Sequence, residues 1–465
     1  MTFVRTTETV EPTRRMAAWP ALAGCGIALL LSFVLNIRAG TNTDVSWIIT
    51  IIEGQFSGKR LYVDILETNP PFSVWLYYPA VAAARILSMS PEFAVAVFTY
   101  LVGLASLGFT HRIARKGGLT TGETRWWFWP GLFAVFLVLP GTVFAQREHI
   151  GLMALLPLLV LQAWRLNEGS ENRVPVLTAI AAGVAGSVII LVKPHWALSI
   201  GLPALYVTWS RRSVLSLLRP EYLTIAAIAV AYLAIVIVAY PEFLGSMYPM
   251  LQQVYMPISN ARGMWLPIIV KFAITLVPWI LLRVRGTVSP VADLAALSSM
   301  GFFAGVLYLG KGWGYHLYPS LAMALIASLA ALEAGLRRGG LEARAQRYAV
   351  LIIVVAFVQA GLANHVLRGP DSRTIDMIRA SNPNPTVAVI GADIGLAFPL
   401  TRMVGGNWSS AYCSDWAGAH ALLRLKTEQS TLGARDKAWL ETFLSGYIGN
   451  HYCPVKLIRI SDKIL

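Results

Sequence analysis

Charged side chains recur in the connections between long apolar segments of this 465-residue chain. Two are carboxylates, Asp44 and Glu148, and three are cations, Arg147, Lys193 and Lys311. Cations can bind a phosphate group and stabilise it as it leaves. A carboxylate can take the proton from an attacking hydroxyl. Such a set therefore suits the transfer of a group from an anionic carrier to an acceptor hydroxyl.

Further polar residues occupy the same connections. His195 and His316 lie beside the lysines and join Arg147, Lys193 and Lys311 as candidate phosphate-binding residues. Three more residues are expected to organise a loop or to face the acceptor: Asp64, Glu67 and Tyr315.

Two other interpretations of these residues stay open. Lys193 and Lys311 could extend to the lipid–water interface without binding a ligand. His149, His195 and His316 could form a metal site, although they lack the tight ligand spacing of a zinc motif. The expected site therefore contains no assigned metal ligand, and a divalent cation remains open as a cofactor.

The composition is that of a membrane protein. Hydrophobic residues make up 56% of the chain and charged residues only 13%, about half the charged share of a soluble domain. The net charge of +14 could suggest a nucleic-acid partner. However, the cations form short clusters between apolar runs and do not line one face, which excludes that partner.

Eleven uncharged runs are long enough to cross a membrane. They define a transmembrane domain over residues 16–366, after an N-terminal tail of residues 1–15. The runs are Met16–Ile37, Phe93–Thr110, Trp126–Phe144, Ile150–Trp164, Val174–Val192, Trp196–Ser210, Tyr222–Tyr240, Gly263–Leu282, Leu294–Leu309, Trp313–Leu332 and Tyr348–Asn364.

Charge determines whether a twelfth apolar stretch, Pro71–Ala84, also spans. If it lies along the outer interface and the N-terminus is cytoplasmic, the basic clusters fall in the inner loops. If it spanned, every cluster from His111 onward would move outside, against the positive-inside rule. We therefore predict an all-α polytopic protein with about eleven transmembrane helices and interfacial helices in the first outer loop.

Residues 370–465 differ in pattern from the rest. Their apolar runs are short, and Thr386–Ile390 and Val455–Ile460 have the composition of strands. We predict a small α/β domain on the outer, periplasmic side. Cys413 and Cys453 both fall in it and could pair in an oxidising compartment, or remain free thiols.

The first outer loop resembles that of the membrane-embedded GT-C glycosyltransferases. The similarity lies in Asp44-Val45-Ser46-Trp47, in Leu61-Tyr62-Val63-Asp64 and in the run from Glu67 to Pro71. It is nearest to the protein-mannosyltransferase and aminoarabinose-transferase branch. In that family an acidic residue after the first helix begins an interfacial helix. The resemblance implies that Asp44 is the catalytic base or orients the acceptor, and that Glu148 is the second acidic residue.

The resemblance also implies the reaction. The expected enzyme moves a sugar from a polyprenyl-phosphate donor to a glycolipid, polysaccharide or protein acceptor. It would act at the periplasmic face of a bacterial inner membrane, surrounded by membrane lipid. One departure from the family is that Val45, and not a second acid, follows Asp44. The alternatives are a secondary transporter, which should show an internal repeat of its helices, and a non-catalytic membrane assembly factor for envelope polysaccharide.

Overall fold

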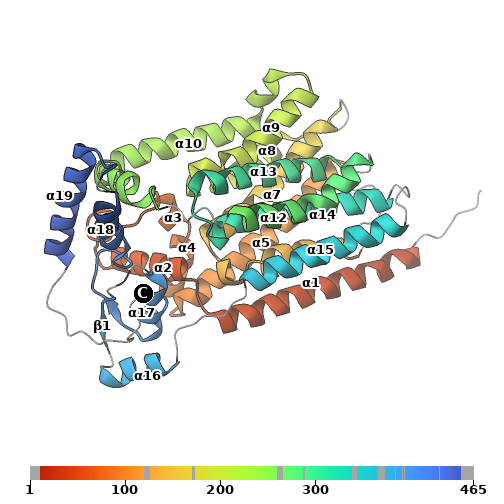
Figure 1. Ribbon diagram of the computed structural model, residues 1–465. Coiled ribbons are helices and arrows are strands. Elements are labelled where there is room, and N and C mark those ends of the chain that lie inside the picture. Colours follow the sequence, from red (N-terminus) through yellow and green to blue (C-terminus); the bar gives the residue numbers. More distant parts are fainter. Residues whose placement is uncertain are drawn as a thin grey trace, which may run out of the picture.

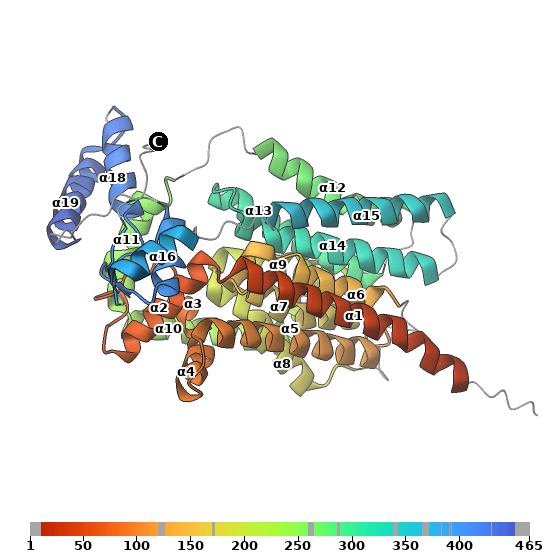
Figure 2. The same cartoon turned by 90° about the horizontal axis from the view of Figure 1, so that it is seen from below.

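The computed structural model describes residues 11–119, 126–169, 173–258, 265–285, 289–337, 343–364 and 372–451, except 383, 390, 392 and 429. Long helices lie side by side in one bundle, and the C-terminal residues cover one end of it (Figures 1 and 2). We call this end of the bundle the capped end.

The bundle contains a helix for each of the eleven predicted spans. Trp126–Phe144 is divided between α6 and the π-helix η1, and the other ten each fall mainly on one α-helix. The bounds are α1 Glu11–Ala39, α5 Pro91–Lys116, α6 Phe128–Phe133, η1 Ala134–Val138, α7 Arg147–Leu166, α8 Val176–Val192, α9 Leu198–Ser210, α10 Pro220–Ala239, α12 Trp265–Val284, α13 Pro290–Leu309, α14 Gly314–Arg337 and α15 Ala343–Asn364.

Seven of the described helices are long and apolar enough to cross a membrane: α1, α5, α7, α10, α12, α13 and α14. Helices α7 and α14 form the centre, because 94% and 89% of their apolar stretches are buried. Helices α1 and α10 lie at the periphery, with 11% and 6% buried. Apolar side chains exposed over whole helices are expected where lipid is the solvent. The protein is therefore a multi-pass membrane protein.

The connection after α1 forms three short helices at the capped end: α2 Thr43–Phe56, α3 Phe72–Trp75 and α4 Tyr78–Ile86. The apolar stretch Pro71–Ala84 is thus divided between α3 and α4, of four and nine residues. Both are far shorter than the roughly 20 residues that a helix needs to cross a bilayer. The structure agrees with the prediction that this stretch does not span.

Other connections at the capped end are also short helical segments. The chain forms η2 over Gly141–Val143 before α7, and η3 over Pro194–Ala197 before α9. After α10 come the π-helix η5, the short helix α11 and the π-helix η6: Phe243–Met247, Tyr248–Met250 and Leu251–Tyr255.

The C-terminal part is mostly helical. Strands β1 Thr386–Val387 and β2 Asn407–Trp408 pair in parallel, with Thr386 opposite Asn407. The strand predicted over Thr386–Ile390 is therefore only two residues long, while Val455–Ile460 and Cys453 lie outside the described residues. The helical elements are α16 Ser372–Ser381, η8 Ile394–Leu396, α17 Leu400–Met403, α18 Trp416–Thr427 and α19 Ala434–His451.

Candidate active site

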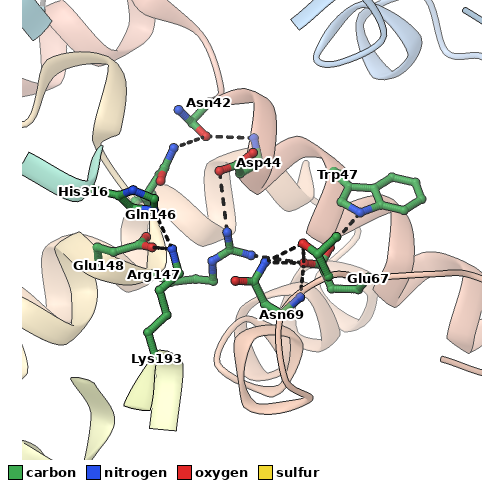
Figure 3. Close-up of polar contacts among 12 residues, drawn as sticks. Asn42, Asp44, Trp47, Glu67, Asn69, Gln146, Arg147, Glu148, Lys193 and His316 are labelled. Atoms are coloured by element: carbon green, nitrogen blue, oxygen red, sulfur yellow. Dashed lines mark hydrogen bonds and ion pairs between the residues drawn. The ribbon is translucent and has the colours of Figure 1, made fainter. Parts of the chain in front are cut away.

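Helix α2, which lies at the capped end of the bundle (Figure 1), places Asp44 in its first turn (Figure 3). The side chain of Asn42 caps the helix by accepting a hydrogen bond from the Asp44 backbone N–H at 2.9 Å. Asn42 also accepts from Gln146 at 2.9 Å and donates to the Thr142 carbonyl at 2.6 Å. The start of α2 is therefore tied to the connection that leads into α7.

Arg147, the first residue of α7, lies between two carboxylates. Its guanidinium nitrogens are 3.6 Å from an Asp44 oxygen and 3.6 Å from a Glu67 oxygen. These distances exceed those of a hydrogen bond, so both contacts are ion pairs without close hydrogen bonding. The buried Arg147 Nε has no hydrogen-bond partner among the described residues. The guanidinium therefore has one buried N–H donor without an acceptor in the part of the chain that the structure describes.

Glu67 is buried and is held by its own loop and by α2. Its carboxylate accepts hydrogen bonds from the Trp47 indole N–H at 2.8 Å and from the Asn69 backbone N–H at 2.9 Å. The Asn69 side-chain amide donates to it as well. These contacts hold the Glu67 carboxylate beside Arg147, and its role in organising the loop or facing the acceptor stays a prediction.

A third ion pair lies next to the two that Arg147 makes. The Lys193 ammonium is 2.6 Å from a Glu148 oxygen and donates to His316 Nε2 at 2.9 Å. It also lies over the Tyr315 ring, 5.1 Å from the ring centre. Four segments far apart in sequence thus meet here: the first outer loop, the start of α7, the turn after α8 and the start of α14.

Burial shifts the pKa of Asp44 and the pKa of Lys193 in opposite directions. It raises the pKa of the Asp44 carboxyl above its ordinary value, and the nearby Arg147 guanidinium offsets part of the rise. It lowers the pKa of the Lys193 ammonium, and the Glu148 carboxylate opposes that shift. Of the three carboxylates, Asp44 is the most accessible, since its side chain is 22% exposed, against 4% for Glu67 and 1% for Glu148.

His195 and Lys311 lie beside the cluster. Burial and the Lys193 charge lower the pKa of His195 to about 3, so the ring is neutral near pH 7. It packs on Trp196, with ring centres 4.6 Å apart. The Lys311 ammonium donates to the backbone carbonyls of Tyr255, Met256 and Ile258. Lys311 therefore holds the segment after η6, and phosphate binding by it stays a prediction.

The described contacts of Asp64 are with Arg60 of its own loop. The Asp64 side chain is 44% exposed, and it accepts a hydrogen bond from the Arg60 backbone N–H at 2.7 Å. Asp64 therefore closes a turn within the first outer loop.

Among the described residues, no three His, Cys, Asp or Glu side chains are grouped so as to hold a metal ion. His149 has both ring nitrogens in hydrogen bonds, to the Ala145 N–H and the Phe136 carbonyl. A shared metal site of His149, His195 and His316 has no support in this part of the chain.

The uncharged residues that hold the charged ones were not predicted from the sequence. Asn42 could have been found, because Asn directly before a helix with an acid in its first turn is a capping signal. Gln146, Asn69 and the Trp47 indole have no comparable local signal, since their partners come from other segments or from loop geometry.

No family model and no curated protein sequence matches this chain. Among solved structures, the crystal structure of ArnT from Cupriavidus metallidurans bound to undecaprenyl phosphate is similar, with a TM-score of 0.55 and 16% identity. The alignment covers 88% of this chain and 89% of ArnT. The chain has the GT-C fold. ArnT is an aminoarabinose transferase of that class, so the predicted fold and resemblance are confirmed.

A second GT-C structure also aligns with the chain. It is the oligosaccharyltransferase AglB from Archaeoglobus fulgidus, in complex with an inhibitory peptide and a dolichol-phosphate. The identity is 14%, the TM-score is 0.43, and the alignment covers 78% of this chain and 58% of AglB.

Proposed function

We propose that this protein is a glycosyltransferase that moves a sugar from a polyprenyl-phosphate donor to an acceptor hydroxyl. The reaction would take place at the periplasmic face of a bacterial inner membrane, where the capped end of the GT-C bundle would lie. The N-terminus would be cytoplasmic and residues 370–465 periplasmic. The undecaprenyl phosphate in the ArnT structure supports a lipid phosphate as the donor's leaving group.

The observation that carries the proposal is the exposure of Asp44 within an otherwise buried charge cluster. Asp44 is the carboxylate that an entering hydroxyl can reach, while Glu67 and Glu148 are buried in ion pairs. A raised pKa also makes a carboxylate a stronger base, provided that it remains ionised at the working pH. Asp44 would therefore take the proton of the acceptor hydroxyl.

The remaining charges suit the leaving group. As the acceptor oxygen bonds to the anomeric carbon, the bond from that carbon to the phosphate oxygen breaks. The departing phosphate gains negative charge, which nearby cations stabilise. Arg147 has one N–H donor without an acceptor among the described residues, and Lys193 uses one ammonium proton toward Glu148 and one toward His316. In this mechanism Glu148 orients Lys193, and His195 stays neutral beside it.

The test is transfer of radiolabelled sugar from polyprenyl-phosphate donors in membranes that contain the protein. Asp44→Asn keeps the size of the side chain and removes its charge, and Asp64→Asn makes the same change at an exposed loop carboxylate. We expect Asp44→Asn to abolish transfer and Asp64→Asn to retain it at equal protein levels. Native transfer by Asp44→Asn would refute the assignment of the base. Absence of transfer from every donor would refute the function.

A further inference from the structure

His149 is a fully buried polar side chain that the proposed mechanism does not use, although it follows Arg147 and Glu148 directly. Its Nδ1 accepts a hydrogen bond from the Ala145 backbone N–H at 3.1 Å. Because an amide N–H can only donate, Nδ1 carries no proton. The ring proton is therefore on Nε2, which donates to the Phe136 carbonyl at 2.6 Å. These two bonds hold the imidazole neutral and in one tautomer.

The first partner of His149 is a residue in a costly backbone conformation. Ala145 has a φ of +62°, in the left-handed region that a residue with a Cβ rarely adopts. Its N–H is held by His149, and its carbonyl accepts a hydrogen bond from the buried Tyr77 hydroxyl at 2.7 Å. Such conformations persist where the surroundings hold them, and they cluster at functional sites.

The second partner of His149 lies in the π-helix η1. A π-helix shifts the backbone hydrogen-bond register and can leave carbonyls for other donors. Three consecutive carbonyls of η1 accept from side chains of three different helices. Val135 accepts from Tyr318 of α14, Phe136 from His149 of α7, and Leu137 from Ser32 of α1. The π-helix η1, whose Phe136 carbonyl accepts the hydrogen bond from His149 Nε2, is therefore itself fixed to three helices of the bundle.

We propose that His149 is a positioning residue that sets the direction in which α7 begins. By holding the Ala145 N–H, it keeps Ala145 in the left-handed conformation that turns the chain into α7. That turn places Arg147 between Asp44 and Glu67 and directs Glu148 to Lys193. The catalytic part of this inference rests on the proposed glycosyltransferase function.

Two amide substitutions separate the two hydrogen bonds. The Oδ1 of Asn in His149→Asn lies near the place of Nδ1 and can accept from Ala145. The Nε2 of Gln in His149→Gln reaches toward the place of Nε2 and can donate to Phe136. His149→Phe removes both bonds at similar volume. The readouts are kcat for sugar transfer and hydrogen exchange of the backbone amides around Ala145.

We expect His149→Asn to keep kcat within about threefold of native and to keep the amide protection. His149→Phe should lower kcat about a hundredfold, the loss that a misplacement of about 1 Å can cause. It should also expose the Ala145 amide to exchange. Adding Ala145→Gly to His149→Phe should restore part of the activity, because glycine adopts a positive φ without steric cost. A purely structural role for the ring would not predict this rescue.

Native kcat and native amide protection in His149→Phe would overturn the proposal. If His149→Phe does not fold, the two amide variants decide it. His149→Asn should be the more active and the better protected, and equal behaviour of the two would overturn the proposal. If the native protein transfers no sugar, the proposed function fails, and amide exchange in the same variants still tests the role of His149.

Discussion

The buried pair of Glu148 and Lys193 predicts a specific pattern of stability changes. The two charged atoms are 2.6 Å apart, with side chains only 1% and 9% exposed. At an effective dielectric constant of about 20, their attraction is about 6 kcal/mol before the cost of desolvation. Lys193→Met removes the cation and leaves the Glu148 charge buried without it. We expect this to lower the free energy of unfolding by about 3–5 kcal/mol.

The double variant Glu148→Gln with Lys193→Met should recover most of that loss, because no unpaired charge then remains buried. His316 still loses the donor to its Nε2, which costs about 1 kcal/mol. Equilibrium unfolding of the native, single and double variants in mild detergent measures these differences. Sugar transfer should be lost in both variants, because the phosphate-stabilising cation is absent from each.

Two results would refute this reasoning. If Lys193→Met unfolds at the same denaturant concentration as the native protein, the Glu148 charge is not buried in the way the structure shows. If the double variant is as unstable as the single one, the defect lies in packing around the lysine stem and not in an unpaired charge. A double variant that is stable but inactive is the expected result.

Three further predictions use other parts of the site. Sugar transfer should fall with decreasing pH as Asp44 becomes protonated. The midpoint of this fall should lie above the ordinary aspartate pKa of about 3.9, because burial raises the pKa of Asp44. A rate unchanged down to pH 4 would contradict this. Lys311→Met should destabilise the protein by about 1–3 kcal/mol, since three carbonyls lose their donor. If Lys311 only holds this loop, the Michaelis constant for the donor should change little, whereas a large increase would favour direct phosphate binding. Arg402→Gln should make the C-terminal part several-fold more sensitive to limited proteolysis, because ion pairs worth about 1 kcal/mol to Glu53 and Glu92 are lost; unchanged cleavage would argue against this anchor.

Much of the bundle could be predicted because a bilayer imposes a length and a polarity on every helix that crosses it. The run Trp126–Phe144 shows the limit of that reasoning. Its hydropathy predicts one helix, but the chain passes from α6 into the π-helix η1. The carbonyls of η1 accept hydrogen bonds from side chains of α1, α7 and α14, and no local pattern of apolar residues can reveal these distant donors.

For the site as well, features that depend on the local sequence could be predicted, and contacts between distant segments could not. Asp44, Arg147 and Lys193 were predicted from their places in connections on one side of the membrane, and the structure brings them together. The hydrogen bonds from Lys311 to backbone carbonyls could not be predicted, because these carbonyls lie more than 50 residues earlier in the chain. The small extent of the C-terminal sheet was also not predicted. The length of β1 is set by its pairing with the two-residue strand β2, some twenty residues later in the chain.

The tie between the two ends of the chain has a consequence for biogenesis. Arg402 of α17 pairs with Glu53 of α2, 349 residues earlier, and the Phe398 carbonyl accepts from the Thr43 hydroxyl beside Asp44. At about 5–20 residues per second, synthesis of the intervening chain takes roughly 17–70 s. During that time α2 lacks the segment that later packs along it. A newly synthesised chain therefore completes the packing around α2 only after the segment that contains Phe398 and Arg402 has been made and folded.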